Sequence, residues 1–113
     1  MRPNVADPLS ATLQALADPT RRAIIERLSR GPASVSDLAR PFDMSLPAVV
    51  QHLAVLESAG VVASEKVCRV RTCRIEPAAL SRAEQWIHER RTAWEQRLDR
   101  LGAYLAANPE EPS

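Results

Sequence analysis

Four basic side chains fall within nine positions of this 113-residue chain, at Lys66, Arg69, Arg71 and Arg74. The whole chain has 15 basic and 14 acidic residues, so its net charge of +1 says little about a partner. A basic cluster in a near-neutral chain is consistent with a surface that contacts a polyanion, although many charge clusters are only solvated surface. Binding to an anionic polymer is therefore the first hypothesis to test against the rest of the sequence.

The segment before this cluster predicts a helix-turn-helix over residues 34–60. Ser34 and Asp37 match a capping box at the start of a two-turn helix. Ser45 is the N-cap candidate of the next helix, which should stop at Gly60, with Leu46, Val49, Leu53 and Leu56 on its inner side. A helix, a turn of about three residues and a second helix have the size of a DNA-binding helix-turn-helix.

The basic residues themselves are predicted to lie on a β-hairpin over residues 61–75. The hydrophobic period there changes from about 3.6 to 2, and β-favouring residues dominate. We place the turn at Val67-Cys68, which pairs Lys66 with Arg69 and sets Cys73 opposite Val62. The hairpin would then project its arginines from a small wing.

The remaining elements are predicted to be helical. Two short helices should follow Asp7-Pro8 and Asp18-Pro19, each an N-cap aspartate followed by proline. Pro77 opens the longest element, which should run to about residue 106 and span roughly 45 Å. Its apolar residues recur every seven positions, which favours a partner helix and hence a homodimer over a frayed core helix.

We therefore expect a mainly α protein with a small β-hairpin wing, a winged helix-turn-helix that dimerises through its terminal helices. The single domain would cover residues 9–106, between an N-terminal arm (1–8) and a flexible tail (107–113). Expected dimer-interface residues are Leu9, Leu13, Leu80, Ile87, Trp94, Leu98, Leu101 and Leu105.

Several segments, in the same order, resemble the ArsR/SmtB family of bacterial transcriptional repressors across about residues 9–105. They are Leu16-Ala-Asp-Pro-Thr-Arg-Arg-Ala-Ile, Ser34-Val-Ser-Asp-Leu-Ala, Met44-Ser-Leu-Pro-Ala-Val, His52-Leu-Ala-Val-Leu-Glu-Ser-Ala-Gly-Val-Val and the arginine-rich hairpin. The resemblance implies a dimer that binds a palindromic DNA operator and blocks transcription, often of its own operon. It does not identify an effector.

The helix over 45–60 should present its outward residues to DNA bases, with Gln51 able to bond an adenine edge and Ala48 and Val50 near thymine methyls. His52 would either bond a phosphate or pin the helix. No basic residue lies in this helix, so Arg69 and Arg71 should supply the contacts to phosphate or minor groove, and binding should depend only modestly on salt. The expected DNA-binding residues are Ser45, Pro47, Ala48, Val50, Gln51, His52, Arg69 and Arg71.

Neither a metal site nor a cofactor is expected. Relatives that sense metals use cysteine or histidine sets that are missing here, and five strand residues should hold Cys68 and Cys73 about 16 Å apart, too far to chelate one ion. Cys73 should be a core thiol. Cys68 occupies a turn position where relatives usually have glycine, so a longer turn, a thiol or metalloid sensor, and an introduced substitution remain open.

Other classes of function are less well supported by the sequence. The chain has no constellation of nucleophile, histidine and acid and no glycine-rich phosphate loop, so an enzyme is not expected. No apolar run is long enough for a membrane span, and residues 1–10 lack a signal-peptide pattern, so we expect a cytoplasmic protein. A winged-helix module that binds protein instead of DNA remains the alternative, because the recognition helix is uncharged.

Overall fold

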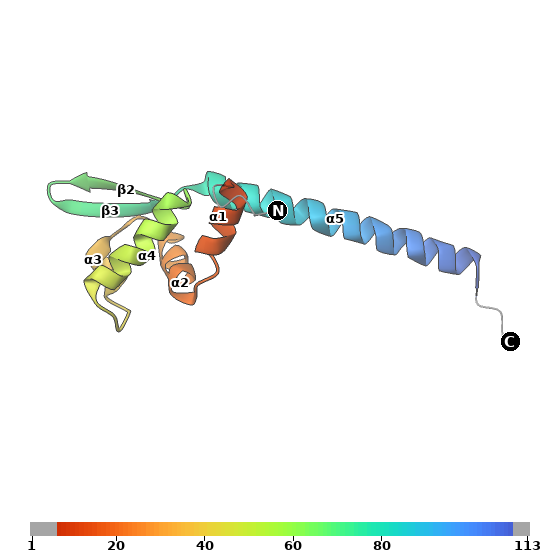
Figure 1. The fold of residues 1–113 in the computed structure, drawn as a ribbon, viewed down its shortest axis with the longest axis horizontal. Helices are drawn as coiled ribbons and strands as arrows, with labels where there is room; N and C mark the ends of the chain where they lie inside the picture. The colour runs from red at the N-terminus through yellow and green to blue at the C-terminus, as the bar shows by residue number, and fades with distance from the viewer. Residues whose placement is uncertain (1–6, 110–113) are drawn as a thin grey trace. The chain divides into compact units, whose positions relative to one another are not determined.

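A computed structural model of the chain describes residues 7–109. The elements, in chain order, are α1 (Pro8–Ala15), α2 (Pro19–Leu28), β1 (Ala33–Ser34), α3 (Val35–Ala39), α4 (Leu46–Ser58), β2 (Val62–Val67), β3 (Val70–Ile75) and α5 (Pro77–Ala107). Figure 1 labels these helices and strands on the ribbon. They fall into two units that divide within α5, after residue 83. Residues 1–6 of the predicted arm and 110–113 of the predicted tail lie outside the described residues.

The helix starts follow the capping residues that the sequence predicts. Asp7 caps α1 by accepting a hydrogen bond of 3.0 Å from the backbone N–H of Ser10, and Asp18 caps α2 through Arg21 in the same way. These bonds hold the pKa of each capping carboxyl below its ordinary value, for Asp7 with a further, larger contribution from the Ser10 hydroxyl. The first backbone N–H groups of a helix have no partner within the helix. The prolines in the first turns therefore restrict the backbone without the loss of a helical hydrogen bond.

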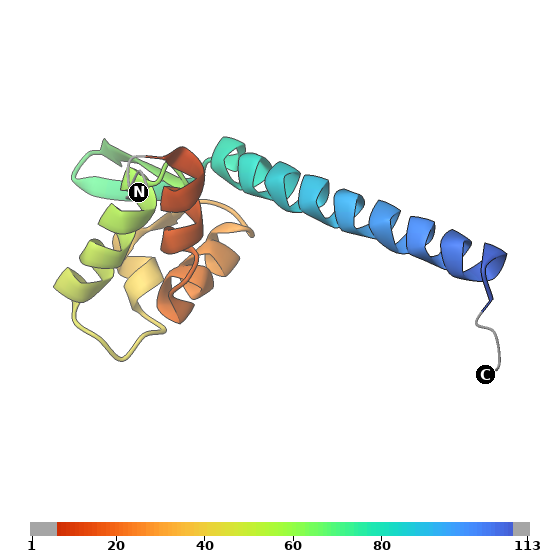
Figure 2. The ribbon, with the colours of Figure 1, turned by 45° about the vertical axis from the view of Figure 1, so that its right-hand side comes forward.

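The core of the first unit is organised around α4. This helix contacts α1, α2, α3 and β2, and in Figure 2 the red, orange and yellow helices of the first unit lie to one side of the green α4. The largest fully buried side chains are Ile24, Leu38, Leu53, Leu56, Val49, Val61, Thr12 and Cys73. Burial of the apolar members of this set, all but Thr12, is the main force holding the helix-turn-helix together, at about 25 cal/mol per Å².

The structure corrects one predicted inner position of α4 and shows which residues of α1 are buried. Leu46 was placed on the inner side of α4, yet its side chain is 49% exposed, because it is the first helical residue and Met44 packs against the core instead. In α1 the buried residues are Thr12 and Ala15, while Leu13 is largely exposed. The leucines of α1 therefore lie away from the centre of the core.

The sheet has three antiparallel strands in the order β1-β3-β2, and the sequence had predicted only two of them. The hairpin register also differs from the prediction by one turn position: Val67 pairs with Val70, so the turn is Cys68-Arg69, and Cys73 lies opposite Ser64. Ala33 of β1 pairs with Cys73 on the other side. This places β3 in the centre of the sheet and explains why Cys73 is fully buried.

The α5 helix begins at Pro77, as predicted, and continues to Ala107. Its first turns belong to the first unit, where Ala79 and Ala83 are buried and Leu80 packs against the core. From residue 84 onward none of its described residues is buried. None of the described helices is both long enough and apolar enough to cross a membrane.

Candidate nucleic-acid interface

The outward face of α4 carries the residues predicted to meet DNA. Pro47 and Gln51 are exposed, and Ala48 and Val50 are half-buried beside them. Val55 continues this face toward the C-terminus, with 41% of its surface exposed. These residues are thus at least partly accessible, the exposed Leu46 lies beside them, and the face is uncharged.

The N-terminus of α4 offers little to an anion. Ser45 Oγ accepts the N–H of Ala48 at 3.3 Å, and the N–H of Val49 bonds the Ser45 carbonyl at 3.2 Å. Pro47 has no N–H to donate. Within the described residues, the first turn therefore keeps only the Leu46 N–H for a phosphate, so phosphate contacts must come largely from side chains elsewhere.

The hairpin contains the basic cluster, but half of its charge is already paired. The guanidinium of Arg71 forms an ion pair with Glu57 of α4, and that of Arg74 lies 3.1 Å from Glu76. Lys66 and Arg69 form no ion pair with any described residue. The unpaired positive charge of the wing is consequently concentrated at its tip, and both views place this tip at the same end of the unit as the N-terminus of α4 (Figures 1 and 2).

The tip turn has an unusual backbone. Cys68 and Arg69 have φ angles of 49° and 73°, both in the left-handed region, and they are the only non-glycine residues with positive φ among those described. Positive φ at both central residues is the pattern of a type I′ hairpin turn, which normally contains Asn-Gly. Arg69 therefore lies at a backbone position whose positive φ glycine adopts without steric strain.

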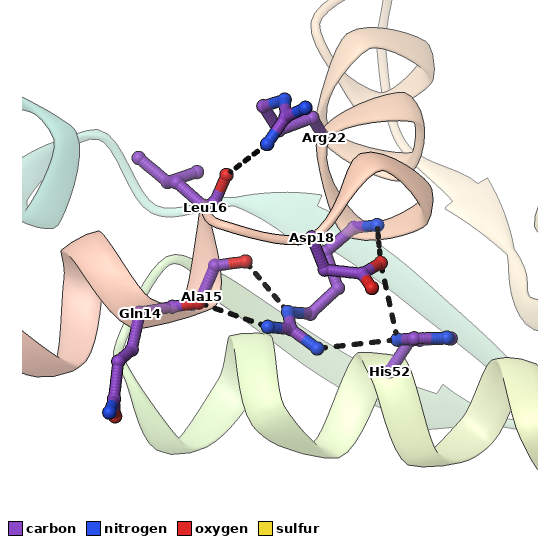
Figure 3. Close-up of polar contacts among 7 residues, drawn as sticks. Gln14, Ala15, Leu16, Asp18, Arg22 and His52 are labelled. Atoms are coloured by element: carbon purple, nitrogen blue, oxygen red, sulfur yellow. Dashed lines mark hydrogen bonds and ion pairs between the residues drawn. The ribbon is translucent and has the colours of Figure 1, made fainter.

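His52 lies behind the candidate interface, in a cluster that joins three helices (Figure 3). Its Nδ1 is 3.8 Å from a carboxylate oxygen of Asp18 and 3.5 Å from a guanidinium nitrogen of Arg21. Arg21 also donates to the carbonyls of Gln14 and Ala15 at the end of α1. These contacts favour the interpretation that His52 pins α4 against the α1–α2 corner.

In the same cluster, the guanidinium groups of Arg21 and Arg22 are engaged by backbone carbonyls. Besides Arg21, Arg22 donates to the carbonyl of Leu16 at 2.8 Å (Figure 3). The last carbonyls of a helix have no partner within the helix and carry partial negative charge, so both cations satisfy and stabilise the end of α1. The pKa of Asp18 is held down first by its bond from the Arg21 N–H, with a smaller contribution from His52.

The two cysteines occupy different environments. Cys68 is exposed in the tip turn, whereas Cys73 is buried in the central strand. Burial raises the pKa of the Cys73 thiol, which favours the unreactive neutral form. In residues 7–109 no group of three or more histidine, cysteine or acidic side chains is arranged to hold a metal ion.

The expected dimer-interface residues divide between the two units. In the second unit Ile87, Trp94, Leu98, Leu101 and Leu105 each leave about half of their surface exposed. In the first unit Leu13 is exposed, Leu9 is half-buried and Leu80 is partly covered by the core. A single chain therefore leaves most of the predicted interface uncovered.

Comparison with known proteins identifies the family. A family model described as a helix-turn-helix domain matches residues 16–65. The crystal structure of the ArsR family transcriptional regulator RHA00566 is 50% identical, has a TM-score of 0.76, and is matched over 98% of its length and 79% of this chain. The chain belongs to the ArsR family of transcriptional regulators. This agrees with the resemblance found in the sequence and with the winged helix-turn-helix fold described above.

Two further relatives of this ArsR family chain are named regulators. The HTH-type transcriptional regulator Rv2034 of Mycobacterium tuberculosis is 48% identical over 68 residues, which cover 60% of this chain and 64% of Rv2034. The transcriptional repressor SdpR of Bacillus subtilis is 33% identical over 58 residues, 51% of this chain and 64% of SdpR. Both matches thus span slightly less than two thirds of the relative. ArsR family proteins are regulators and not enzymes, which supports the expectation that this chain catalyses no reaction.

The residues that hold the side chains of Arg71 and His52 in this ArsR family protein were not identified from the sequence. Glu57 and Ser64, which hold Arg71, were not singled out, and Asp18 was recognised only as a helix cap. The heptad and capping patterns could not reveal them, because each contact joins residues from separate elements. An acidic residue near the end of an otherwise uncharged helix was the one available signal for Glu57.

Proposed function

We propose that this chain is a homodimeric, sequence-specific DNA-binding repressor that acts in the cytoplasm on a palindromic operator, in its own operon. The observation that carries the proposal is the combination of an exposed, uncharged α4 face with a hairpin tip whose Lys66 and Arg69 form no ion pair within residues 7–109. An uncharged helix face suits direct reading of base edges, and a charged wing tip suits the backbone or minor groove. SdpR, named a transcriptional repressor, supports repression over activation.

In this proposal each contact has a distinct task. Gln51, Pro47, Ala48 and Val50 would face the bases in the major groove, with Gln51 able to bond an adenine in bidentate fashion. Ser45 would set the start of the reading helix through its cap, and His52 would hold its depth by contact with the α1–α2 corner. Arg69 would reach the phosphate backbone or minor groove.

The homodimer is supported by the uncovered apolar residues of α1 and α5. Exposed apolar residues repeated along one helix mark an interface, because water contact with such a patch is unfavourable. In α5 they follow the spacing of a helix that packs against a second helix. Two copies of α4 would then face two half-sites, which is why a palindromic operator is proposed.

The charge distribution gives the proposal a quantitative expectation. If only Lys66 and Arg69 reach phosphates, a dimer neutralises about four of them, and the logarithm of affinity should fall with the logarithm of salt with a slope of about −3.6. A slope steeper than about −7 would mean that other cations make the contacts.

Fluorescence anisotropy of a labelled duplex from the region upstream of the coding sequence tests the proposal. It is measured against a scrambled duplex at several salt concentrations, with reduced thiols and no added metal. Selective binding of the upstream duplex supports a DNA-reading repressor. Absence of binding to either duplex would favour a protein-binding module, and selective binding abolished by a thiol oxidant would support the response through Cys68 or Cys73.

A further inference from the structure

Arg71 takes part in a closed set of contacts between the hairpin and α4. Its Nε donates to Ser64 Oγ at 3.0 Å, and its guanidinium forms an ion pair with the Glu57 carboxylate. The Ser64 hydroxyl in turn donates to Glu57 Oε1 at 2.6 Å. Two strands and the recognition helix are thus joined through three side chains, each partly shielded from solvent.

The register of the hairpin explains why Arg71 points toward α4. Residues directly opposite in an antiparallel pair, and those two positions apart, share one face of the sheet. Arg71 is opposite Lys66 and two positions from the buried Cys73, so it lies on the face that packs against the core. Two cations opposite each other are unfavourable, and the Glu57 carboxylate compensates that repulsion.

These contacts conflict with a role for Arg71 in binding phosphate. A guanidinium engaged by a carboxylate and a hydroxyl would have to leave both partners to reach DNA, and Glu57 would lose its cationic partner. Arg69, two residues away, has no such partner among the described residues. Of the three arginines of the hairpin, Arg71 and Arg74 are thus paired within the protein, and Arg69 is available for DNA.

We propose that Arg71 is a positioning residue that fixes the wing relative to the recognition helix through Glu57 and Ser64, and that it does not contact DNA. The inference rests on the proposed function of DNA binding. Its consequence is that Glu57, an acid near the DNA-facing surface, supports operator binding. Removal of the Glu57 charge therefore weakens specific binding, whereas a simple electrostatic view predicts that it strengthens binding.

The test compares Arg71→Met, Glu57→Met and the double variant with Arg69→Ala, as dimers, on the upstream and scrambled duplexes. Positioning predicts that Arg71→Met and Glu57→Met each weaken upstream-duplex binding about tenfold, that the double variant is no weaker than either, and that the salt slope is unchanged. Arg69→Ala is the matched control, because loss of two phosphate contacts per dimer should reduce the slope by about 1.8. Binding to the scrambled duplex should stay at the wild-type level in both positioning variants.

Arg71→Lys provides a second variant that folds with the charge retained. Lysine lacks the planar fork through which the Nε and a terminal nitrogen of Arg71 contact Ser64 and Glu57, so positioning predicts a loss close to that of Arg71→Met, whereas phosphate contact predicts near wild-type affinity. A flatter salt slope in Arg71→Met, or tighter binding by Glu57→Met, overturns the inference and leaves DNA binding intact. A wild-type protein that binds neither duplex overturns the proposed function and the inference together.

Discussion

Replacing the tip turn should stabilise the protein while weakening its binding to DNA. The double variant Cys68→Asn, Arg69→Gly converts the turn to Asn-Gly, the dipeptide that a type I′ turn favours. Cys68 and Arg69 now adopt φ angles of 49° and 73°, in a region where a side chain with a Cβ is strained. Because Arg69 also supplies the unpaired charge at the tip, the same change removes a DNA contact.

The size of both effects can be worked from the structure. A non-glycine residue in the left-handed region costs roughly 1–2 kcal/mol, and the additional unfolded-state freedom of glycine returns about 0.5–1 kcal/mol of this. A net stabilisation of about 1 kcal/mol remains, which raises Tm by about 4 °C for a domain of this size. Loss of Arg69 from both protomers should flatten the salt slope by about 1.8.

Calorimetry at a fixed protein concentration and anisotropy at several salt concentrations measure the two effects on the same preparations. The single variant Cys68→Asn is the control, since it should gain stability and bind DNA as the wild type does. An unchanged or lower Tm in the double variant would refute the strained turn. A raised Tm with unchanged DNA affinity and slope would show that the tip does not reach DNA.

Three further results are expected. The free energy of unfolding should fall below about pH 4, because the pKa of Asp18 is lower in the folded state than in the unfolded chain. The stabilising contribution of this carboxylate is present above its unfolded-state pKa and is lost as pH falls through its folded-state pKa. In acid unfolding followed by circular dichroism, Asp18→Asn should reduce this dependence, since asparagine keeps a capping oxygen. Leu98→Glu should raise the dimer dissociation constant at least about tenfold in sedimentation velocity, since it places a charge among the exposed apolar residues of α5. Unaltered sedimentation would exclude these residues of α5 from the interface. Ala54→Lys adds a cation to the exposed side of α4, so DNA affinity should rise and the slope of log affinity against log salt should steepen by up to about 1.8. Weaker binding without a steeper slope would place Ala54 away from phosphates.

Local signals in the sequence predicted the elements of the fold well. Asp18 and Ser45 are N-caps in the structure as they were in the prediction, because capping depends on residues no more than three positions apart. The α5 helix was predicted from its periodicity and from Pro77 to within a residue or two of its observed end. The family resemblance, which rests on several short segments, is confirmed by the similarity to RHA00566.

Features that depend on distant pairing were not predictable. The hairpin turn was misplaced by one residue because Cys68-Arg69 contains no glycine or asparagine to mark a type I′ turn. The short strand β1 has two residues, too few for a periodic pattern. The pairing of Arg71 with Glu57 depends on how the hairpin packs against α4, and nothing in the sequence alone indicates it.

The contacts of Arg21 and His52 also set how the protein would measure distance along DNA. They bind the end of α1 to α2 and α4, so in the proposed dimer α4 cannot turn independently of the α1 leucines at the interface. Within each protomer, the distance from the reading helix to the α1 leucines is then fixed and not adjustable. Such a protein would tolerate a changed base in a half-site better than a spacer lengthened by about five base pairs, which moves one half-site to the opposite face of the double helix.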